Sequence, residues 1–137
     1  MKKILLYPIT LIYYFAYLVV LCTIHPIQWV AYKVFGDEGL KVSFDYVAYF
    51  TLKCTHILGT QYTFENRELI PKNVPIIFVS NHQSLLDTGG IIWYLRQFYV
   101  AFVTKKELSK GIPAISYNLR HSKYVLIDRN NPKKKIK

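Results

Sequence analysis

The chain has 137 residues, enough for one domain, and 52% of them are hydrophobic, slightly above the roughly 45–50% of an average soluble domain. Its two cysteines, Cys22 and Cys54, exclude a disulfide framework and a four-ligand zinc site built from cysteine. The net charge of +10 lies almost wholly after residue 95, and this predicts an anionic partner. Nucleic acid is not expected as that partner, because the aromatic residues lie in apolar segments and not between the basic residues.

The first predicted element is an uncharged segment of 21 residues, 4–24. It is longer than the roughly 7–15 residues of the hydrophobic region in a signal peptide, and no small-residue cleavage site follows it. Its length would allow a membrane-spanning helix of about 20 residues. However, Tyr13, Tyr14 and Tyr17 occupy its middle, whereas tyrosine prefers the headgroup level at the ends of a span.

A second short apolar helix is predicted at residues 27–35, because Pro26 interrupts the first. We therefore expect residues 1–35 to form a membrane-embedded helical segment, in which two helices dip into one leaflet and both ends face the cytoplasm. A single spanning anchor is the alternative. Residues 36–137 are expected to form the globular body.

In the body, a turn is predicted at residues 36–39, from their glycines and acidic residues. Helices are predicted at 41–58, 85–96 and 112–119, with the first ending at Gly59, and strands at 61–65, 75–79, 99–103 and 124–127. Residues 75–79 form an unbroken apolar run, typical of a strand buried on both faces. Strands that alternate with helices indicate an α/β body with a mainly parallel sheet.

The polar residues from Ser80 to Asp87 directly follow that strand, at the end where open α/β sheets place their ligands. Ser84 is a plausible helix N-cap, which makes Asp87 the third helical residue. Two interpretations stay open from the spacing alone. Asp87 completes a capping box and His82 is a surface residue, or Asp87 fixes the tautomer of His82, which then takes a proton from an alcohol as a general base.

The run NHQSLLD at residues 81–87 resembles the Asn-His-x4-Asp motif of the glycerolipid acyltransferases, in particular those that use 1-acyl-glycerol 3-phosphate. Residues 65–66 and the run VPIIFVS before the motif resemble the lead into it in that family. Residues 104–108 are similar to a lysine-containing turn, and LIDRNN at 126–131 resembles a second motif. The resemblance covers residues 60–131 and implies a partial acyltransferase domain, while residues 1–35 look like the membrane-embedding helices of bacterial members.

The resemblance implies that His82 is the general base and that Asp87 orients it. Substrate binding is implied for four further residues, with Arg129 on the acceptor phosphate: Asn81, Ser84, Lys105 and Arg129. Arginine suits that task because its planar fork holds phosphate through two hydrogen bonds. The alternative for Arg129 and Lys105 is that both are solvated surface residues.

The sequence departs from the family pattern at two places. Lys123 stands where the second motif commonly begins with glycine, so the turn there is expected to differ. The printed sequence ends eight residues after Arg129, before the Glu-Gly-Thr-Arg motif and the proline-containing motif of the family. We therefore expect an incomplete acyltransferase domain with little activity by itself.

The implied reaction moves a fatty acyl group from acyl-CoA or acyl-carrier protein to 1-acyl-glycerol 3-phosphate, which forms phosphatidic acid for phospholipid biosynthesis. It needs no cofactor and no metal. The expected partners are the lipid bilayer, lysophosphatidic acid and the acyl donor, at the cytoplasmic face of the inner membrane.

Two other functions compete with acyl transfer. A serine hydrolase would use Ser80 or Ser84 as nucleophile, but the sequence lacks the Gly-x-Ser-x-Gly elbow. A catalytically inactive, membrane-anchored fragment would bind anionic lipid or a partner through its basic C-terminal half, including the lysines of residues 133–137.

Overall fold

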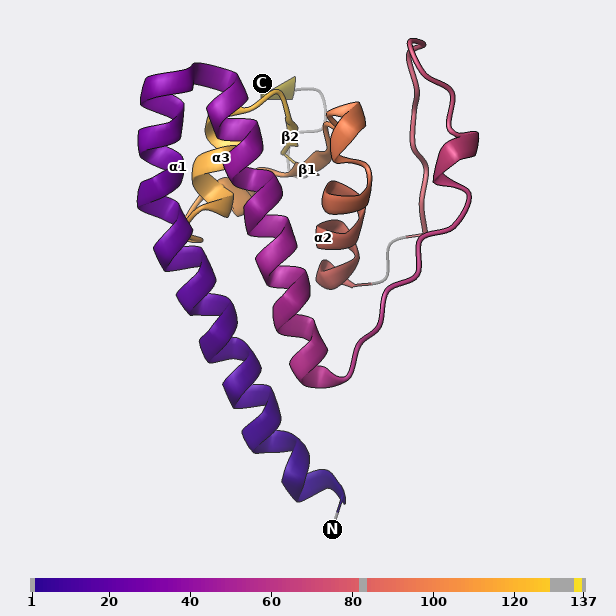
Figure 1. Ribbon diagram of the computed structural model, residues 1–137. Coiled ribbons are helices and arrows are strands. Elements are labelled where there is room, and N and C mark those ends of the chain that lie inside the picture. Colours follow the sequence, from indigo (N-terminus) through magenta and orange to yellow (C-terminus); the bar gives the residue numbers. More distant parts are fainter. Residues whose placement is uncertain (1, 82–83, 129–134, 137) are drawn as a thin grey trace.

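The computed structural model describes residues 2–81, 84–128 and 135–136 (Figure 1). Its regular elements are, in chain order, α1 (Lys2–Thr55), α2 (Leu85–Tyr94), β1 (Val103–Lys105), α3 (Ile115–His121), β2 (Val125–Ile127) and β3 (Lys135–Ile136). Short 3-10 helices lie between them at His56–Leu58, Arg67–Leu69, Arg96–Phe98 and Lys106–Ser109. The described chain is therefore mostly helical, with a small sheet.

The helix α1 bends into two antiparallel arms at Gly36 (Figure 1). Gly36 has φ 60 and ψ −141, a combination that is open to glycine and strained for residues with a side chain. A Cβ atom at Gly39 would collide with the backbone carbonyl of Ala31 on the opposite arm. The turn predicted at residues 36–39 is confirmed, and its two glycines let the arms pack closely.

The prediction that Pro26 ends the first helix is wrong. Gly36 is the only residue of α1 with non-helical backbone angles, so the first arm continues through Pro26. Proline removes one helical hydrogen bond. Leu21, Ile24 and Gln28, on both sides of Pro26, are buried against the rest of the protein, and this packing holds the helix together despite the lost bond.

The N-terminal part of the first arm projects beyond the body (Figure 1) and exposes large apolar side chains. Tyr7, Leu11 and Phe15 are each at least 70% exposed. By length and composition, the helical stretch Tyr7–Leu58 could cross a membrane. These side chains form an apolar surface that no other described part of the chain covers.

The sheet has the order β1-β2-β3. β1 and β2 pair in parallel over three residues, from Val103 opposite Val125 to Lys105 opposite Ile127, and α3 provides the connection between them. β3 pairs antiparallel with β2. The expected α/β fold with a parallel pair is thus present in the segment from β1 to β2, on a smaller scale than predicted.

Two predicted strands are absent from the described chain. Residues 61–65 and 75–79 form no regular strand, and within the second run Ile77 and Val79 are about nine-tenths exposed, at 89% and 91%. An apolar, β-branched run becomes a strand only when a neighbouring strand accepts its backbone hydrogen bonds, and here the run lies apart from the sheet (Figure 1). The prediction of a doubly buried strand before the motif is therefore wrong.

The other predicted elements shift by a few residues. The strand predicted at 99–103 occupies Val103–Lys105, because Tyr99 has a left-handed backbone with φ 51. The helix predicted at 112–119 begins at Ile115, directly after Ala114 with φ 58. The strand at 124–127 and the helix end at Gly59, which has φ 76, are confirmed.

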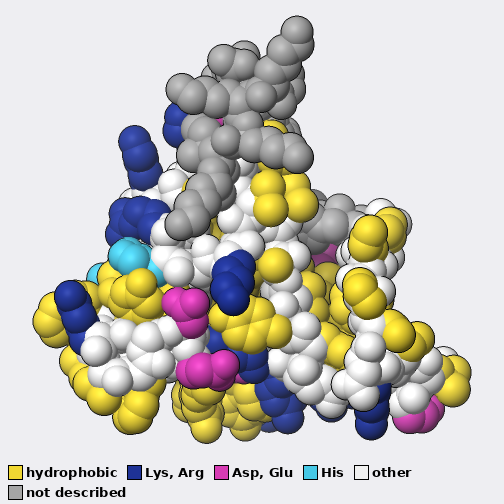
Figure 2. Space-filling view, turned by 90° about the horizontal axis from the view of Figure 1, so that it is seen from above, with side chains coloured by type: hydrophobic (Ala, Val, Ile, Leu, Met, Phe, Trp, Pro, Cys, Tyr) yellow, Lys and Arg dark blue, Asp and Glu magenta, His cyan; other side chains and the backbone are white. Residues whose placement is uncertain are grey.

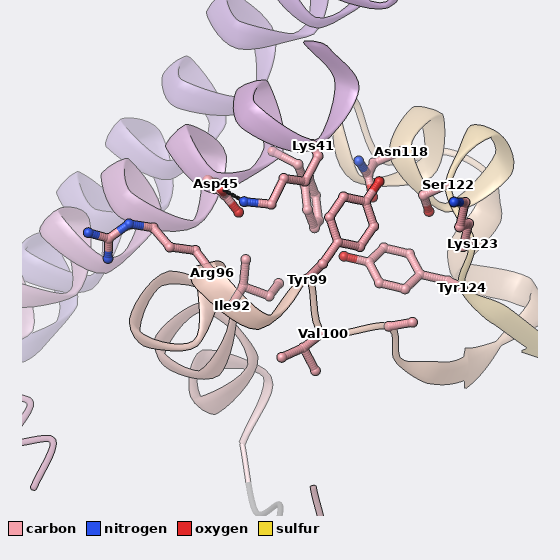
Figure 3. A pocket seen from close by; sticks show the side chains of 12 residues that line it. Lys41, Asp45, Ile92, Arg96, Tyr99, Val100, Asn118, Ser122, Lys123 and Tyr124 are labelled. Carbon is pink, nitrogen blue, oxygen red and sulfur yellow. Dashed lines mark hydrogen bonds and ion pairs between the residues drawn. The ribbon is translucent and has the colours of Figure 1, made fainter. Parts of the chain in front are cut away.

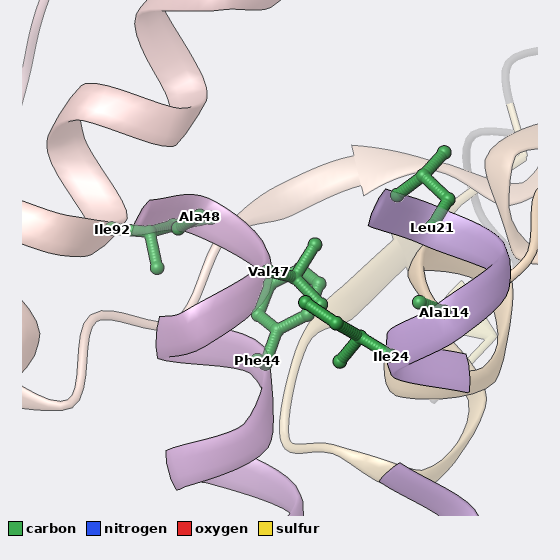
Figure 4. Close-up of a cluster of buried hydrophobic side chains, with 7 residues drawn as sticks. All are labelled: Leu21, Ile24, Phe44, Val47, Ala48, Ile92 and Ala114. Carbon is green, nitrogen blue, oxygen red and sulfur yellow. The ribbon is translucent and has the colours of Figure 1, made fainter. Parts of the chain in front are cut away.

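The hydrophobic core joins both arms of α1 to the body (Figure 4). Its buried members are Leu21 and Ile24 on the first arm, Phe44, Val47 and Ala48 on the second, Ile92 on α2, and Ala114 before α3. Residues of the expected membrane segment thus belong to the same core as the expected body. The division at residues 35 and 36 into two units stays a prediction.

The end of the molecule at which α1 bends carries charged side chains beside the exposed apolar Val34 and Phe35. Seen from above, it shows acidic and basic side chains between hydrophobic ones (Figure 2). Lys33, Asp37 and Glu38, next to the bend, are all exposed. The projecting apolar part and the charged bend therefore lie at opposite ends of the first arm of α1.

Candidate active site

The motif identified in the sequence lies at the N-terminal end of α2. Ser84 has an extended backbone, and its Oγ accepts a hydrogen bond of 3.2 Å from the Leu86 N–H. The Asp87 Oδ2 accepts one of 2.8 Å from the Ser84 N–H. Ser84 and Asp87 therefore form the predicted capping box, which stabilises the first turn of the helix.

The capping box fixes where the Asp87 carboxylate points. The side chain turns back from the helix toward the residues that precede it, because its oxygen reaches the backbone of Ser84. A carboxylate at a helix N-terminus is also favoured by the partial positive charge there. Asp87 is thus held in a defined position at the start of α2.

Two further predicted site residues, Asn81 and Lys105, lie in the described part of the chain. Asn81 is exposed before α2, and Lys105 is exposed at the carboxyl end of β1. His82 and Arg129 lie outside the described residues. Among the predicted residues that the structure describes, it joins only Ser84 and Asp87 by hydrogen bonds, and the catalytic and binding roles stay predictions.

A cavity of about 310 Å³ lies beside the motif. Ser80, Leu86, Thr88 and Gly89 border it from the motif side, and Val103 and Thr104 of β1 border it just before Lys105. The size falls at the lower end of the roughly 300–1,000 Å³ of small-molecule sites. The cavity therefore touches two of the segments that carry predicted site residues, the motif and β1.

The opposite wall of this cavity comes from α1, which the sequence analysis did not connect with the site. Ala48, Thr51, Leu52 and Thr55 line it from the second arm. Their spacing of three, four and seven residues places them on one helix face, and this pattern is a signal that could have identified them. The Oγ atoms of Thr51 and Thr55 bond to carbonyls of their own helix, so these hydroxyls add little polarity to the wall.

α2 approaches this wall closely at Gly89. A Cβ atom there would lie 3.7 Å from Leu52 Cγ and from Thr51 Oγ1, which is ordinary van der Waals contact. Gly89 and Gly90, which weaken the helix in terms of propensity, thus lie where α2 faces other parts of the chain. The mostly apolar side chains that line the cavity suit a flexible apolar chain.

A second, much smaller pocket lies at the other end of α2 (Figure 3). Its volume of about 30 Å³ holds little more than one or two water molecules. The rings of Tyr99 and Tyr124 form its middle, whereas the Arg96 side chain points away from them. Burial raises the pKa of the Tyr124 phenol, so this hydroxyl stays protonated.

Two buried polar atoms border this small pocket without a hydrogen-bond partner in the described chain, the Asn118 Oδ1 and the Ser122 Oγ. The charged Lys41 is already paired with Asp45 at 2.7 Å. In residues 2–81, 84–128 and 135–136, no group of three potential metal ligands comes together. The small pocket therefore lacks the room for an organic substrate, and the larger cavity is the candidate site.

Comparison with known proteins identifies one family. The family model described as Acyltransferase matches residues 61–137, which is more than half of the chain and includes the motif, α2, β1, α3 and β2. No curated protein and no solved structure matches the chain. The chain therefore belongs to the Acyltransferase family.

Proposed function

We propose that the protein transfers a fatty acyl group from acyl-CoA or acyl-carrier protein to 1-acyl-glycerol 3-phosphate. The observation that carries this proposal is the apolar cavity of about 310 Å³ that begins at the motif residues Ser80 and Leu86. An acyl chain is the part of these substrates that gains most from leaving water, at about 0.8 kcal/mol for each buried CH₂ group. The cavity offers it a site beside the residues proposed for the chemistry.

In the proposed reaction, the free hydroxyl of the acceptor attacks the thioester carbonyl, and His82 takes the hydroxyl proton. The C–O bond forms, the C–S bond breaks, and the departing sulfur receives the proton from His82. Asp87 orients the imidazole and stabilises its charged form. Two observations support this role for Asp87: its carboxylate is held at the start of α2, and it turns toward the residues that precede the helix.

The acceptor phosphate is proposed to bind to basic residues that follow β1 and β2. Lys105 ends β1, and Arg129 follows β2 by two residues in the sequence. Because β1 and β2 run parallel, their carboxyl ends lie at the same edge of the sheet, and Lys105 stands at that edge. Asn81 and Ser84 are proposed to contact the substrate from the motif.

The membrane is the proposed source of the lipid acceptor. The projecting arm of α1 exposes Leu11 and Phe15, and such a surface binds the interface of a bilayer. We propose attachment to the cytoplasmic face of the inner membrane. Replacing Leu11 and Phe15 by serine should release the protein into the soluble fraction, whereas high salt should not, because salt screens charges and leaves apolar burial intact. Release by salt alone would favour attachment through the basic C-terminal half.

The products formed by membranes that contain the chain extended to full domain length test the proposed reaction. Labelled acyl-CoA and 1-acyl-glycerol 3-phosphate should yield labelled phosphatidic acid, and the His82→Ala variant should not produce it. Release of free fatty acid instead would indicate a hydrolase. Neither product above the level of membranes without the protein would indicate a membrane-bound protein without this activity.

A further inference from the structure

A hydrogen bond joins the first arm of α1 to the loop before α3. The Ala114 N–H donates to the His25 Nδ1 at 3.1 Å, across 89 positions of sequence. Ala114 is fully buried, and the His25 ring is half-buried and meets the Tyr117 ring edge-on at 5.6 Å. His25 is thus a contact between the helical hairpin and the body.

The residue held by His25 is in a strained turn. Ala114 has φ 58 and ψ −51, and the Ile115 N–H donates to the Pro113 carbonyl at 2.6 Å. This is a γ-turn with a positive central φ, which is rare and strained for a residue with a side chain. Ile115, the next residue, lines the large cavity. The strained turn therefore determines where one wall of the cavity lies.

The contact requires a neutral His25. A backbone N–H can only donate, so Nδ1 must offer its lone pair. His56 and His121 differ, because their Nδ1 atoms lie 2.8 and 2.9 Å from the carbonyls of Thr60 and Tyr117, which can only accept. Protonation is compatible with the contacts of His56 and His121 and destroys the contact of His25.

The titratable and charged groups nearest to this contact come from α1 and α3. Burial raises the pKa of the Tyr117 phenol, which stays neutral in acid. His121 stacks on Tyr117 at 4.3 Å, and Tyr32 contacts both rings. Arg120 of α3 is permanently charged and bonds to the Ser109 carbonyl. In the described chain no carboxylate lies within ion-pairing distance of His25 to favour its charged form.

We propose that His25 is a pH-sensitive positioning residue, which holds the strained turn at Ala114 and the Ile115 wall of the cavity while it is neutral and releases them when it is protonated. When His25 is protonated, its Nδ1–H and the Ala114 N–H are two donors that face each other, so the hydrogen bond is lost. The strain of the turn at Ala114 then favours opening of that turn. Histidine side chains in general change charge within about pH 5–8, so this range is the one to test. This device goes beyond acyl transfer and does not depend on it.

Amide hydrogen exchange of the ¹⁵N-labelled full chain in phospholipid bicelles tests the proposal. The protection of the Ala114 amide, corrected for the intrinsic pH dependence of exchange, should fall by about fivefold or more between about pH 7.5 and about pH 5. Scalar coupling between the Ala114 nitrogen and the His25 Nδ1 should disappear over the same range. Protection of the Ile92 amide in α2 should change far less.

Three variants distinguish positioning from mere packing. His25→Asn keeps a neutral acceptor near the position of Nδ1, so Ala114 should stay protected at both pH values. His25→Ala should leave Ala114 unprotected at both, and His121→Asn should behave like the parent. The proposal is overturned if parent and His25→Asn show the same pH dependence at Ala114, or if the parent coupling persists at about pH 5.

Discussion

At the N-terminal end of α2, Ser84 and Asp87 cap the helix beside an apolar cavity of about 310 Å³; at its C-terminal end, Arg96 and Tyr99 border a polar pocket of about 30 Å³. The second end has more charged side chains, yet Lys41 is paired with Asp45 and Arg96 points away from the pocket. The first end has few charges and ample room. The difference shows that space beside a defined carboxylate identifies a candidate site better than a gathering of titratable residues does.

The largest expected effect is the loss of the proposed base at the N-terminal end. In a chain extended to full domain length, His82→Ala should lower acyl transfer by ~10² to 10⁴-fold, as expected for the removal of a general base. Phosphatidic acid formation by washed membranes measures it. Arg96→Ala, at the other end of α2, is the matched control and should stay within a few-fold of the parent. Equal losses in both variants would remove the functional difference between the two ends.

Asp87→Asn separates orientation of His82 from capping of the helix. The Asn oxygen can still accept from the Ser84 N–H, so the unfolding midpoint should stay close to that of the parent. Activity should nevertheless fall steeply, because an amide does not stabilise the charged imidazole. A variant that loses stability and activity together would indicate that Asp87 serves only as a cap.

A larger side chain at Gly89 should narrow the cavity. Gly89→Leu should lower the use of long-chain acyl donors roughly tenfold relative to short-chain donors, since the added atoms occupy space near Leu52 and Thr51. Gly89→Ala is the control, because its single methyl group makes ordinary contacts and helix propensity favours it by up to ~1 kcal/mol. An unchanged chain-length preference in Gly89→Leu would argue against the acyl-chain site.

Ser84→Ala is expected to affect stability more than chemistry. The loss of the N-cap hydroxyl should cost ~1 kcal/mol of unfolding free energy. Chemical denaturation measures it, with turnover in the same preparation as a comparison. A loss of activity far beyond the loss of folded protein would instead support direct substrate contact by Ser84.

The smallest effect is expected in the polar pocket. Asn118 is 2% exposed, and its Oδ1 has no partner in the described chain. Asn118→Leu should therefore change the unfolding free energy by less than ~1 kcal/mol, since an apolar group of similar shape removes an unpaired acceptor. A loss of several kcal/mol would show that the pocket is a structural hydrogen-bonding site.

Local signals in the sequence predicted local structure well. Ser84 and Asp87 predicted the capping box, Gly59 the helix end, and residues 36–39 the bend, because each depends on the backbone chemistry of a few neighbouring residues. The family of the chain was also predictable, from motifs in order. The membrane attachment and the roles of the site residues stay predictions.

Features that depend on distant partners were predicted less well. Residues 75–79 have the composition of a buried strand but lie exposed without a partner strand, and Pro26 does not end its helix, because tertiary packing maintains it. The α1 wall of the cavity was missed, although residues 48, 51, 52 and 55 share one helix face. The composition of a segment does not reveal which other elements it will contact. The cavity forms only where α1 contacts α2 and the sheet, so composition alone could not predict it.

The bend of α1 also has an electrical consequence. Lys33 lies in the last turn of the first arm, where the helix dipole is negative, and Asp37 and Glu38 lie in the first turn of the second arm, where it is positive. Their charges complement both dipoles, and moving such a group to the centre of a bilayer costs at least ~2.5 kcal/mol. If α1 enters a bilayer, its N-terminal end therefore enters first and the bend stays in water. The charges at the bend thus set the orientation of the hairpin relative to the bilayer.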